Sequence, residues 1–335
     1  MSATKKVKLG NQGLNVPIIG LGCMGMTNIG NFEIYGKGNE KESIATIHRS
    51  LELGGNFLDT ADLYGPLENE RLIAKAIKGN RDAYILASKF GYEINDQEQI
   101  TRNINGSKQY IKIAIERSLK NLGTDYIDLY YLHRLDQNTA IEETVSAMAE
   151  LVKEGKIGYI GLSEVSSATI KRAHSIHPLT ALQTEYSIFE RSVEHAGILE
   201  TLKELGIGFV AYSPLGRGFL SGNFQTPDDF AANDFRKYSS RFQGDNFYKN
   251  LELVKEMSKL ANEKGVTSSQ LAIAWVIAKG YLPIPGTKRI NYLEQNIAAT
   301  EIVLSPEEIG RLEKVIPLGL SHGLRYDEAS MPGWE

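Results

Sequence analysis

The chain has 335 residues, of which 42% are hydrophobic and 23% charged, and its formal net charge is −4. This composition is typical of a globular protein and offers no basic field for binding nucleic acid. The single cysteine, Cys23, excludes an internal disulfide. No stretch approaches the roughly 20 apolar residues of a membrane helix. The basic start is not followed by the apolar stretch of a secretory signal. We therefore expect a cytoplasmic protein with neither nucleic acid nor membrane as partner.

In chain order, a short hairpin precedes alternating strands and helices. Apolar runs at Val7–Leu9 and Leu14–Pro17 flank a glycine-containing turn and predict the hairpin. The strands predicted after it are Ile18–Leu21, Asn56–Asp59, Tyr84–Ser88, Ile127–Leu132, Ile157–Leu162, Ala181–Thr184, Gly208–Tyr212 and Leu282–Pro285. The predicted helices are Lys41–Leu53, Glu68–Lys78, Gln109–Leu122, Ile141–Glu154, Ser167–His174, His195–Leu205, Ser268–Lys279 and Asn291–Thr300.

Eight β–α units predict an α/β protein, a (β/α)8 TIM barrel with an N-terminal β-hairpin and extra helices, in one domain over residues 1–335. An open, doubly wound sheet is the alternative. Against it, the glycines of Gly20–Gly25 do not open a helix, as a dinucleotide fingerprint requires. Two stretches interrupt the repeat: the long loop Ser213–Asp245, with an extra helix at Asn246–Lys264 after it, and an irregular tail over 317–335.

Four chemically active side chains close, or closely follow, predicted strands: Asp59, Tyr64, Lys89 and His133. The C-terminal ends of the strands are where catalytic groups collect in parallel barrels. A carboxylate, a phenol, an ammonium and an imidazole together can hold and move protons, which predicts an enzyme. Each residue alone also fits a cap, a turn or a solvated surface position, so the prediction depends on the set.

The motifs and their order along the chain resemble those of the aldo-keto reductase family. Their sequences are most similar to its auxin-induced-protein-like and pyridoxal-reductase-like branch. The matching segments are Leu58–Gly65, Ala87–Lys89, Leu129–Arg134, Gly155–Ser163 and Ile284–Arg289, spread over nearly the whole chain. The resemblance implies reduction of aldehydes and ketones to alcohols by NADPH, with hydride from nicotinamide C4 and a proton from Tyr64. It also implies that Lys89, held by Asp59, lowers the pKa of Tyr64 and that His133 orients the carbonyl oxygen.

The resemblance further implies a set of cofactor contacts, with nicotinamide and pyrophosphate near the strand ends and the 2′-phosphate of NADPH at Lys288 and Arg289. The implied cofactor-binding residues are Gly22, Cys23, Met24, Asp59, Ser163, Gln183, Tyr212, Ser213, Pro214, Leu215, Arg217, Gly218, Gly286, Thr287, Lys288, Arg289, Gln295 and Asn296. One departure is Glu164, where many family members have Asn beside the carboxamide-binding serine.

Two other functions are possible for such a chain. Some relatives bind NADPH but act as regulatory subunits of membrane channels, with little turnover. A metal-dependent isomerase on the same barrel would need a cluster of carboxylates and histidines, and the sequence predicts no metal site. We expect a small-molecule carbonyl substrate and a monomer or weak homo-oligomer, with Tyr35, Phe90, Phe189, Phe219 and Tyr238 as apolar pocket walls.

Overall fold

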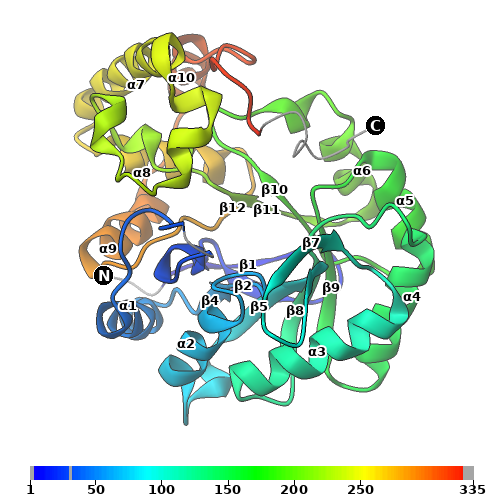
Figure 1. The fold of residues 1–335 in the computed structure, drawn as a ribbon. Coiled ribbons are helices and arrows are strands. Elements are labelled where there is room, and N and C mark those ends of the chain that lie inside the picture. The colour runs from blue at the N-terminus through cyan, green and yellow to red at the C-terminus, as the bar shows by residue number, and fades with distance from the viewer. Residues whose placement is uncertain (1–3, 30–31, 327–335) are drawn as a thin grey trace.

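The computed structural model describes residues 4–29 and 32–326, and it confirms the predicted barrel (Figure 1). Within these residues, eight parallel strands are hydrogen-bonded in the order β12-β11-β10-β9-β8-β5-β4-β3. In chain order they are β3 (Leu21–Gly22), β4 (Phe57–Asp59), β5 (Ile85–Phe90), β8 (Ile127–Leu132), β9 (Ile157–Ser163), β10 (Ala181–Glu185), β11 (Gly208–Tyr212) and β12 (Leu282–Pro283).

Hydrogen bonds between the first and last strands close the barrel. The backbone N–H of Gly20 donates to the carbonyl of Pro283 at 3.0 Å, and that of Gly22 donates to Pro285 at 3.3 Å. Gly22 also forms a parallel bridge with Gly286. A Cβ atom on Gly22 would lie 2.8 Å from the carbonyl oxygen of Ile284, so this close approach requires glycine. The open-sheet alternative is thereby excluded.

Helices surround the barrel, one after each strand, in the arrangement that β–α alternation predicts (Figure 1). They are α1 (Glu40–Glu52), α2 (Glu68–Ile77), α3 (Lys108–Leu122), α4 (Ile141–Lys153), α5 (Ser167–Ile176), α6 (Ile198–Leu205), α8 (Ser268–Ala278) and α9 (Ile290–Ala298). The extra helix is α7 (Gly244–Lys264). None of the helices in the described ranges combines the length and apolar character that crossing a membrane requires.

The hairpin of β1 (Lys6–Lys8) and β2 (Asn15–Pro17) packs against the barrel interior. Leu9, Leu14 and Val16 from this segment belong to one buried cluster with interior residues of the barrel such as Leu129 and Val210. A second, larger cluster fills the layer between the strands and the surrounding helices. The hairpin therefore covers one end of the barrel interior and leaves the strand C-termini for the site.

One hairpin and one helix were not predicted. A second hairpin, β6 (Tyr92–Ile94) and β7 (Ile100–Ile104), follows β5, and α10 (Pro306–Val315) precedes the tail. A sequence signal for α10 exists, because Ser305 and Glu308 form a capping box around Pro306. The long loop after β11 contains four short 3-10 helices, and the described part of the tail, 317–326, contains neither helix nor strand. Residues 327–335 of the predicted tail lie outside the described residues.

Candidate active site

The structure brings Asp59, Tyr64 and Lys89 into one hydrogen-bonded group at the C-terminal ends of the strands. The Lys89 ammonium lies 2.5 Å from Asp59 Oδ1 and 3.3 Å from the Tyr64 hydroxyl. Its third hydrogen bond goes to the carbonyl of Thr60 at 2.8 Å. All three ammonium donors are therefore used, and they fix where the charge sits.

Strand register explains this convergence. Asp59 ends β4, and Lys89 lies near the end of the neighbouring β5, where its side chain is fully buried. A lysine is almost never fully buried unless it is paired, and Asp59 is the partner here. The second carboxylate oxygen of Asp59 accepts a hydrogen bond from Gln183 at 2.6 Å, so the pair is also tied to β10 across the barrel.

The pKa values of this group follow from burial opposed by neighbouring charges. Burial raises the pKa of Tyr64, the Lys89 ammonium lowers it, and the net direction is upward. Burial lowers the pKa of Lys89, but Asp59 and Tyr64 outweigh it and raise the net value. The expected effect of Lys89 on Tyr64 is thus present, while the net shift is the opposite of the one expected from the sequence. Tyr64 is a protonated phenol beside a fixed cation at neutral pH.

His133 lies next to Tyr64 at the same rim. The two rings contact edge to face at 6.0 Å, and Tyr92 contacts the imidazole from another side at 5.2 Å. Burial, then the charges of Arg134 and Lys89, lower the pKa of His133 well below its ordinary value. Within the described chain its Nδ1 atom has no hydrogen-bond partner. The imidazole is therefore neutral and able to hydrogen-bond a bound molecule.

A buried acidic group lies behind these residues. Glu70 on α2 accepts a hydrogen bond from Ser88 at 2.7 Å, and Arg117 approaches Asp62 at 3.6 Å. Burial raises the pKa of Glu70 to about 7, against the lowering effect of Ser88. Burial also raises the pKa of Asp62 well above its ordinary value. Both carboxyl groups therefore keep their protons to a higher pH in the folded protein than ordinary carboxyl groups do.

Replacing Glu70 by Gln is expected to remove part of the pH dependence of stability. Because the folded pKa is raised from 4.5 to about 7, Glu70 contributes stability that is full below pH 4.5 and is lost as the pH rises through 7. The free energy of unfolding of the wild type should fall by about 3 kcal/mol more than that of Glu70→Gln between pH 4.5 and 8. Urea denaturation at the two pH values measures this difference, and Glu200→Gln, at an exposed carboxylate, is the control. Equal falls in both proteins would contradict it.

Several residues predicted to contact a nicotinamide lie around this group. The backbone N–H of Cys23 donates to the carbonyl of Asp59 at 2.9 Å, which places the segment of Gly22, Cys23 and Met24 beside β4. Cys23 itself is fully buried, and burial raises its pKa, so it is an inert thiol. Ser163 lies at the end of β9 and Gln183 lies in β10, and both side chains are buried. The two strands are paired at these residues.

The predicted pyrophosphate loop turns sharply after β11. Ser213, Gly216, Arg217 and Gly218 all have positive φ angles, between 51° and 87°. Turns of this kind present backbone N–H groups on a concave side that binds anions. Pro214 and Leu215 belong to the same turn, where Gly218 N–H donates to the Leu215 carbonyl.

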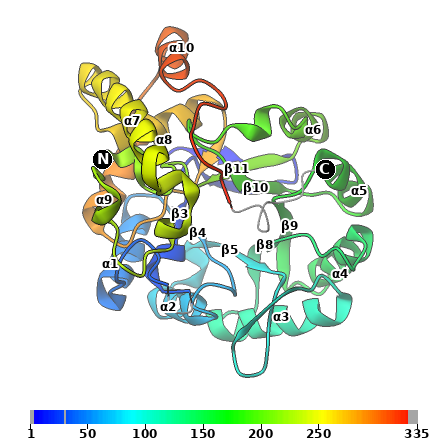
Figure 2. The ribbon, with the colours of Figure 1, turned by 45° about the horizontal axis from the view of Figure 1, so that its top comes forward.

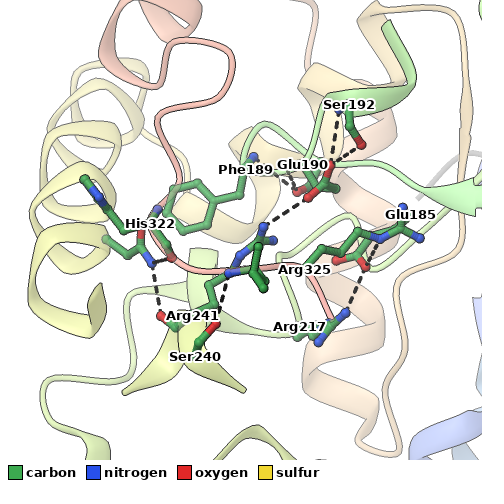
Figure 3. Close-up of polar contacts among 12 residues, drawn as sticks. Glu185, Phe189, Glu190, Ser192, Arg217, Ser240, Arg241, His322 and Arg325 are labelled. Atoms are coloured by element: carbon green, nitrogen blue, oxygen red, sulfur yellow. Dashed lines mark hydrogen bonds and ion pairs between the residues drawn. The ribbon is translucent and has the colours of Figure 1, made fainter. Parts of the chain in front are cut away.

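Arg217 is not a solvated side chain. It is buried and bonded to Glu185 Oε2 at 3.0 Å (Figure 3). The hydroxyl of Tyr212, another implied cofactor contact, lies 2.8 Å from that of Tyr326 in the tail. Both of these implied cofactor contacts, Arg217 and Tyr212, therefore also have partners within the protein, and the partner of Tyr212 lies far along the chain.

The two cations implied to bind the 2′-phosphate, Lys288 and Arg289, differ in exposure. Lys288 is buried, and its ammonium donates to the carbonyls of Gly25, Ile34 and Gly36. Its three donors are thus used to tether the loop before α1. Arg289 is exposed, with its guanidinium 5.9 Å from the ring of Tyr292. Only Arg289 of this pair presents its charge to solvent.

The remaining predicted contacts lie next to this end. Thr287 is half-buried and accepts a hydrogen bond from the backbone N–H of Arg289 at 3.1 Å, while Gly286 is exposed. Gln295 and Asn296 lie on α9, where Asn296 is buried and Gln295 half-buried. Within the described chain, no group of three or more His, Cys, Asp or Glu side chains is placed to hold a metal ion.

The predicted pocket walls are mostly core residues. Phe90 is fully buried and stacks on Tyr130 at 5.0 Å. Phe219 packs on Phe247 at 5.1 Å, and Phe189 is also buried. Tyr238 is 69% exposed. The prediction from aromatic character was wrong for Phe90 and Phe219, because these rings fill space between strands and helices or within the long loop.

Sequence reasoning missed several residues of the site. Arg134 donates to the carbonyl of His133 at 2.8 Å and lies 3.4 Å from Ser163 Oγ. Glu185 is a fully buried carboxylate at the end of β10, a position that the strand pattern alone singles out. Arg325 and Tyr326 come from the tail, and their local sequence gives no signal of their contacts.

Comparisons with known proteins agree with this architecture. A family model described as "Aldo/keto reductase family" matches residues 19–317. A Schizosaccharomyces pombe protein, "Aldo-keto reductase yakc [NADP(+)]", is 43% identical over 325 residues, which cover 95% of this chain and 93% of that protein. The structure of a glycerol dehydrogenase from Gluconobacter oxydans matches with a TM-score of 0.83 at 25% identity, covering 94% of this chain and 95% of that one. The thermostable aldo-keto reductase Tm1743, in complex with the inhibitor epalrestat, matches with a TM-score of 0.74 at 29% identity, covering 93% and 100%.

Proposed function

Because this chain belongs to the aldo/keto reductase family, we propose that it reduces aldehydes and ketones to alcohols with NADPH, and that Tyr64 supplies the proton. The observation that carries the proposal is the hydrogen-bonded group of Asp59, Lys89 and Tyr64 beside a neutral His133. A carbonyl reductase needs a proton donor that is protonated before reaction and stabilised as an anion afterwards. This group meets both requirements.

Tyr64, Lys89, Asp59 and His133 have different roles in the reduction of the carbonyl group. NADPH, when bound, supplies the hydride to the carbonyl carbon. Tyr64 donates its phenolic proton to the oxygen, and the Lys89 ammonium at 3.3 Å stabilises the tyrosinate that remains. Asp59 holds Lys89 charged and in place, and the neutral His133 donates a hydrogen bond that orients the oxygen. In the reverse direction tyrosinate acts as the base.

The residues present fit a dinucleotide phosphate. The orphan nitrogen of His133 and the buried amide of Gln183 supply polar groups at the nicotinamide end. The turn at Ser213–Gly218 supplies a concave backbone for the pyrophosphate, and the exposed guanidinium of Arg289 supplies a cation for a 2′-phosphate. The S. pombe relative, named for NADP(+), supports the choice of cofactor.

The direct test mixes purified protein with an activated aromatic aldehyde and NADPH, or NADH, and follows the loss of reduced-nicotinamide absorbance. We expect turnover with both and a preference for NADPH. Tight NADPH binding without turnover of any carbonyl in a broad panel would favour the regulatory function instead. If neither nucleotide binds, the proposed function is wrong.

Selection of NADPH over NADH is expected to depend on Arg289 rather than Lys288. Replacing Arg289 by Ala removes the exposed cation, so the KM for NADPH should rise roughly tenfold while the KM for NADH changes little. Replacing Lys288 by Met breaks the tether to the loop before α1, so it should weaken both nucleotides alike. Steady-state kinetics with each nucleotide separates the two effects, and the opposite assignment would contradict this prediction.

A further inference from the structure

The described end of the tail crosses from α10 to the strand C-termini and is bonded along its way (Figure 2). Asn250 of α7 exchanges hydrogen bonds with the backbone of His322, and the N–H of Leu324 donates to Ser240. At Gly323 a Cβ atom would lie 2.6 Å from the backbone of Arg241, and its φ angle is +86°. Only glycine fits this crossing; after it Leu324 stays exposed and Arg325 is buried.

Arg325 bonds to residues at the ends of three strands of the barrel, and its contact with Glu185 is drawn in Figure 3. Its guanidinium donates to Glu185 Oε2 at 3.0 Å, to Glu164 Oε1, and to the Tyr212 hydroxyl at 3.1 Å. The side chain is only 6% exposed. These partners follow β9 or end β10 and β11, so one tail residue spans three adjacent strand ends.

Opposite charges are paired in this cluster. The Arg325 guanidinium pairs with the carboxylates of Glu164 and Glu185, and the Arg217 guanidinium pairs with Glu185. Glu164 also accepts a hydrogen bond from the backbone N–H of Glu185 at 3.0 Å. Burial raises the pKa of Glu185, but Arg217 and Arg325 outweigh it, so the net value is lowered and the group is ionised. Loss of Arg325 would remove one positive charge from this buried cluster, in which Arg217 still pairs with Glu185 and the charge of Arg134 still acts on Glu164.

We propose that Arg325 is a positioning residue of the reductase, which fixes Tyr212 and neutralises Glu164 beside the nicotinamide. The proposal rests on the proposed function and on the nicotinamide contacts that the family resemblance implies for Tyr212 and Ser163. It also accounts for Glu164 at a position where many family members have Asn. A carboxylate there is compatible with the neutral ring of NADPH because the tail supplies its countercharge.

The charge has a consequence that a structural role alone does not have. The nicotinamide ring is neutral in NADPH and positively charged in NADP+. Without Arg325 the site beside Glu164 carries one positive charge less, which favours the oxidised ring and leaves the reduced ring almost unaffected. Arg325 therefore keeps the site from favouring NADP+, the product of carbonyl reduction.

The test is to titrate NADPH and NADP+ into the full chain, by fluorescence, for the wild type and for Arg325→Gln, Arg325→Lys and the double variant Glu164→Gln/Arg325→Gln. In Arg325→Gln we expect the ratio of the Kd for NADP+ to the Kd for NADPH to fall roughly tenfold. Arg325→Lys keeps the charge and should keep the ratio. The double variant removes both charges and should restore it.

Arg241→Gln is the matched control, because Arg241 is also a buried arginine next to the tail but pairs with Glu190 at 3.0 Å. It should lower stability without changing the ratio. If Arg325→Gln leaves the ratio unchanged, or weakens both nucleotides equally as Arg241→Gln would, the proposal is overturned. If the wild type binds neither nucleotide, it is the proposed function that fails.

Discussion

Replacing Tyr64 by Phe is expected to reduce kcat for carbonyl reduction about a thousandfold while nucleotide affinity stays within about twofold, since a general acid contributes 10²–10⁴ in rate. The substitution removes only the hydroxyl that lies 3.3 Å from Lys89. The ring remains, with its edge-to-face contact to His133. Steady-state assays of aldehyde reduction measure the loss of kcat, and fluorescence titration with NADPH measures the nucleotide affinity.

Tyr130→Phe is a matched control for this variant. Tyr130 is a fully buried tyrosine of β8, but it stacks on Phe90 in the layer between strands and helices. Losing its hydroxyl should leave kcat unchanged. If Tyr64→Phe retained more than a tenth of wild-type kcat, Tyr64 would not be the proton donor, and water or His133 would have to replace it.

The pH profile of reduction follows from the same two groups. The pKa of His133 is held well below 6.5, so His133 stays neutral over the range in which an ordinary histidine titrates. The pKa of Tyr64 in the free protein is raised above 10, so its acid form is present throughout that range. We therefore expect kcat/KM for reduction to show no inflection from either group between pH 6.5 and 9.

The barrel and the hydrogen-bonded group were predictable because their signals are local. Each strand is a short apolar run, and Asp59, Lys89 and His133 mark where a strand ends. Parallel register then brings strand ends to one rim whatever the loops do. The helix α10 also had a local signal in its capping box, although it was not predicted.

Contacts between distant segments were not predictable in this way. Lys288 resembles a phosphate-binding lysine in sequence, yet its ammonium tethers carbonyls more than 250 residues earlier. Arg325 bonds Glu164 and Glu185 across 161 and 140 residues. Such pairs depend on how a loop and a tail cross in space, and no periodicity or spacing in one sequence encodes that crossing. Glu164 was recognised as a departure, but its partner could not be found.

Replacing Lys89 by Met is expected to lower both stability and turnover. The change leaves Asp59, which is 3% exposed, as a buried charge with Gln183 as its remaining side-chain donor. Removing one partner of a buried ion pair costs about 3–5 kcal/mol, so the free energy of unfolding should fall by that amount. Turnover should fall at least about a hundredfold, because the cation bonded to the Tyr64 hydroxyl, which stabilises the tyrosinate, is then absent.

The double variant Asp59→Asn/Lys89→Met separates these two effects. It removes both charges of a pair joined at 2.5 Å and keeps an acceptor for Gln183, so most of the lost stability should return in urea denaturation. Turnover should stay as low as in Lys89→Met, since the cation beside Tyr64 is still absent. Recovery of turnover together with stability would mean that Lys89 only supports the fold. Recovery of stability alone would show that the ammonium acts on the phenol, which is the role that its 3.3 Å contact with Tyr64 supports.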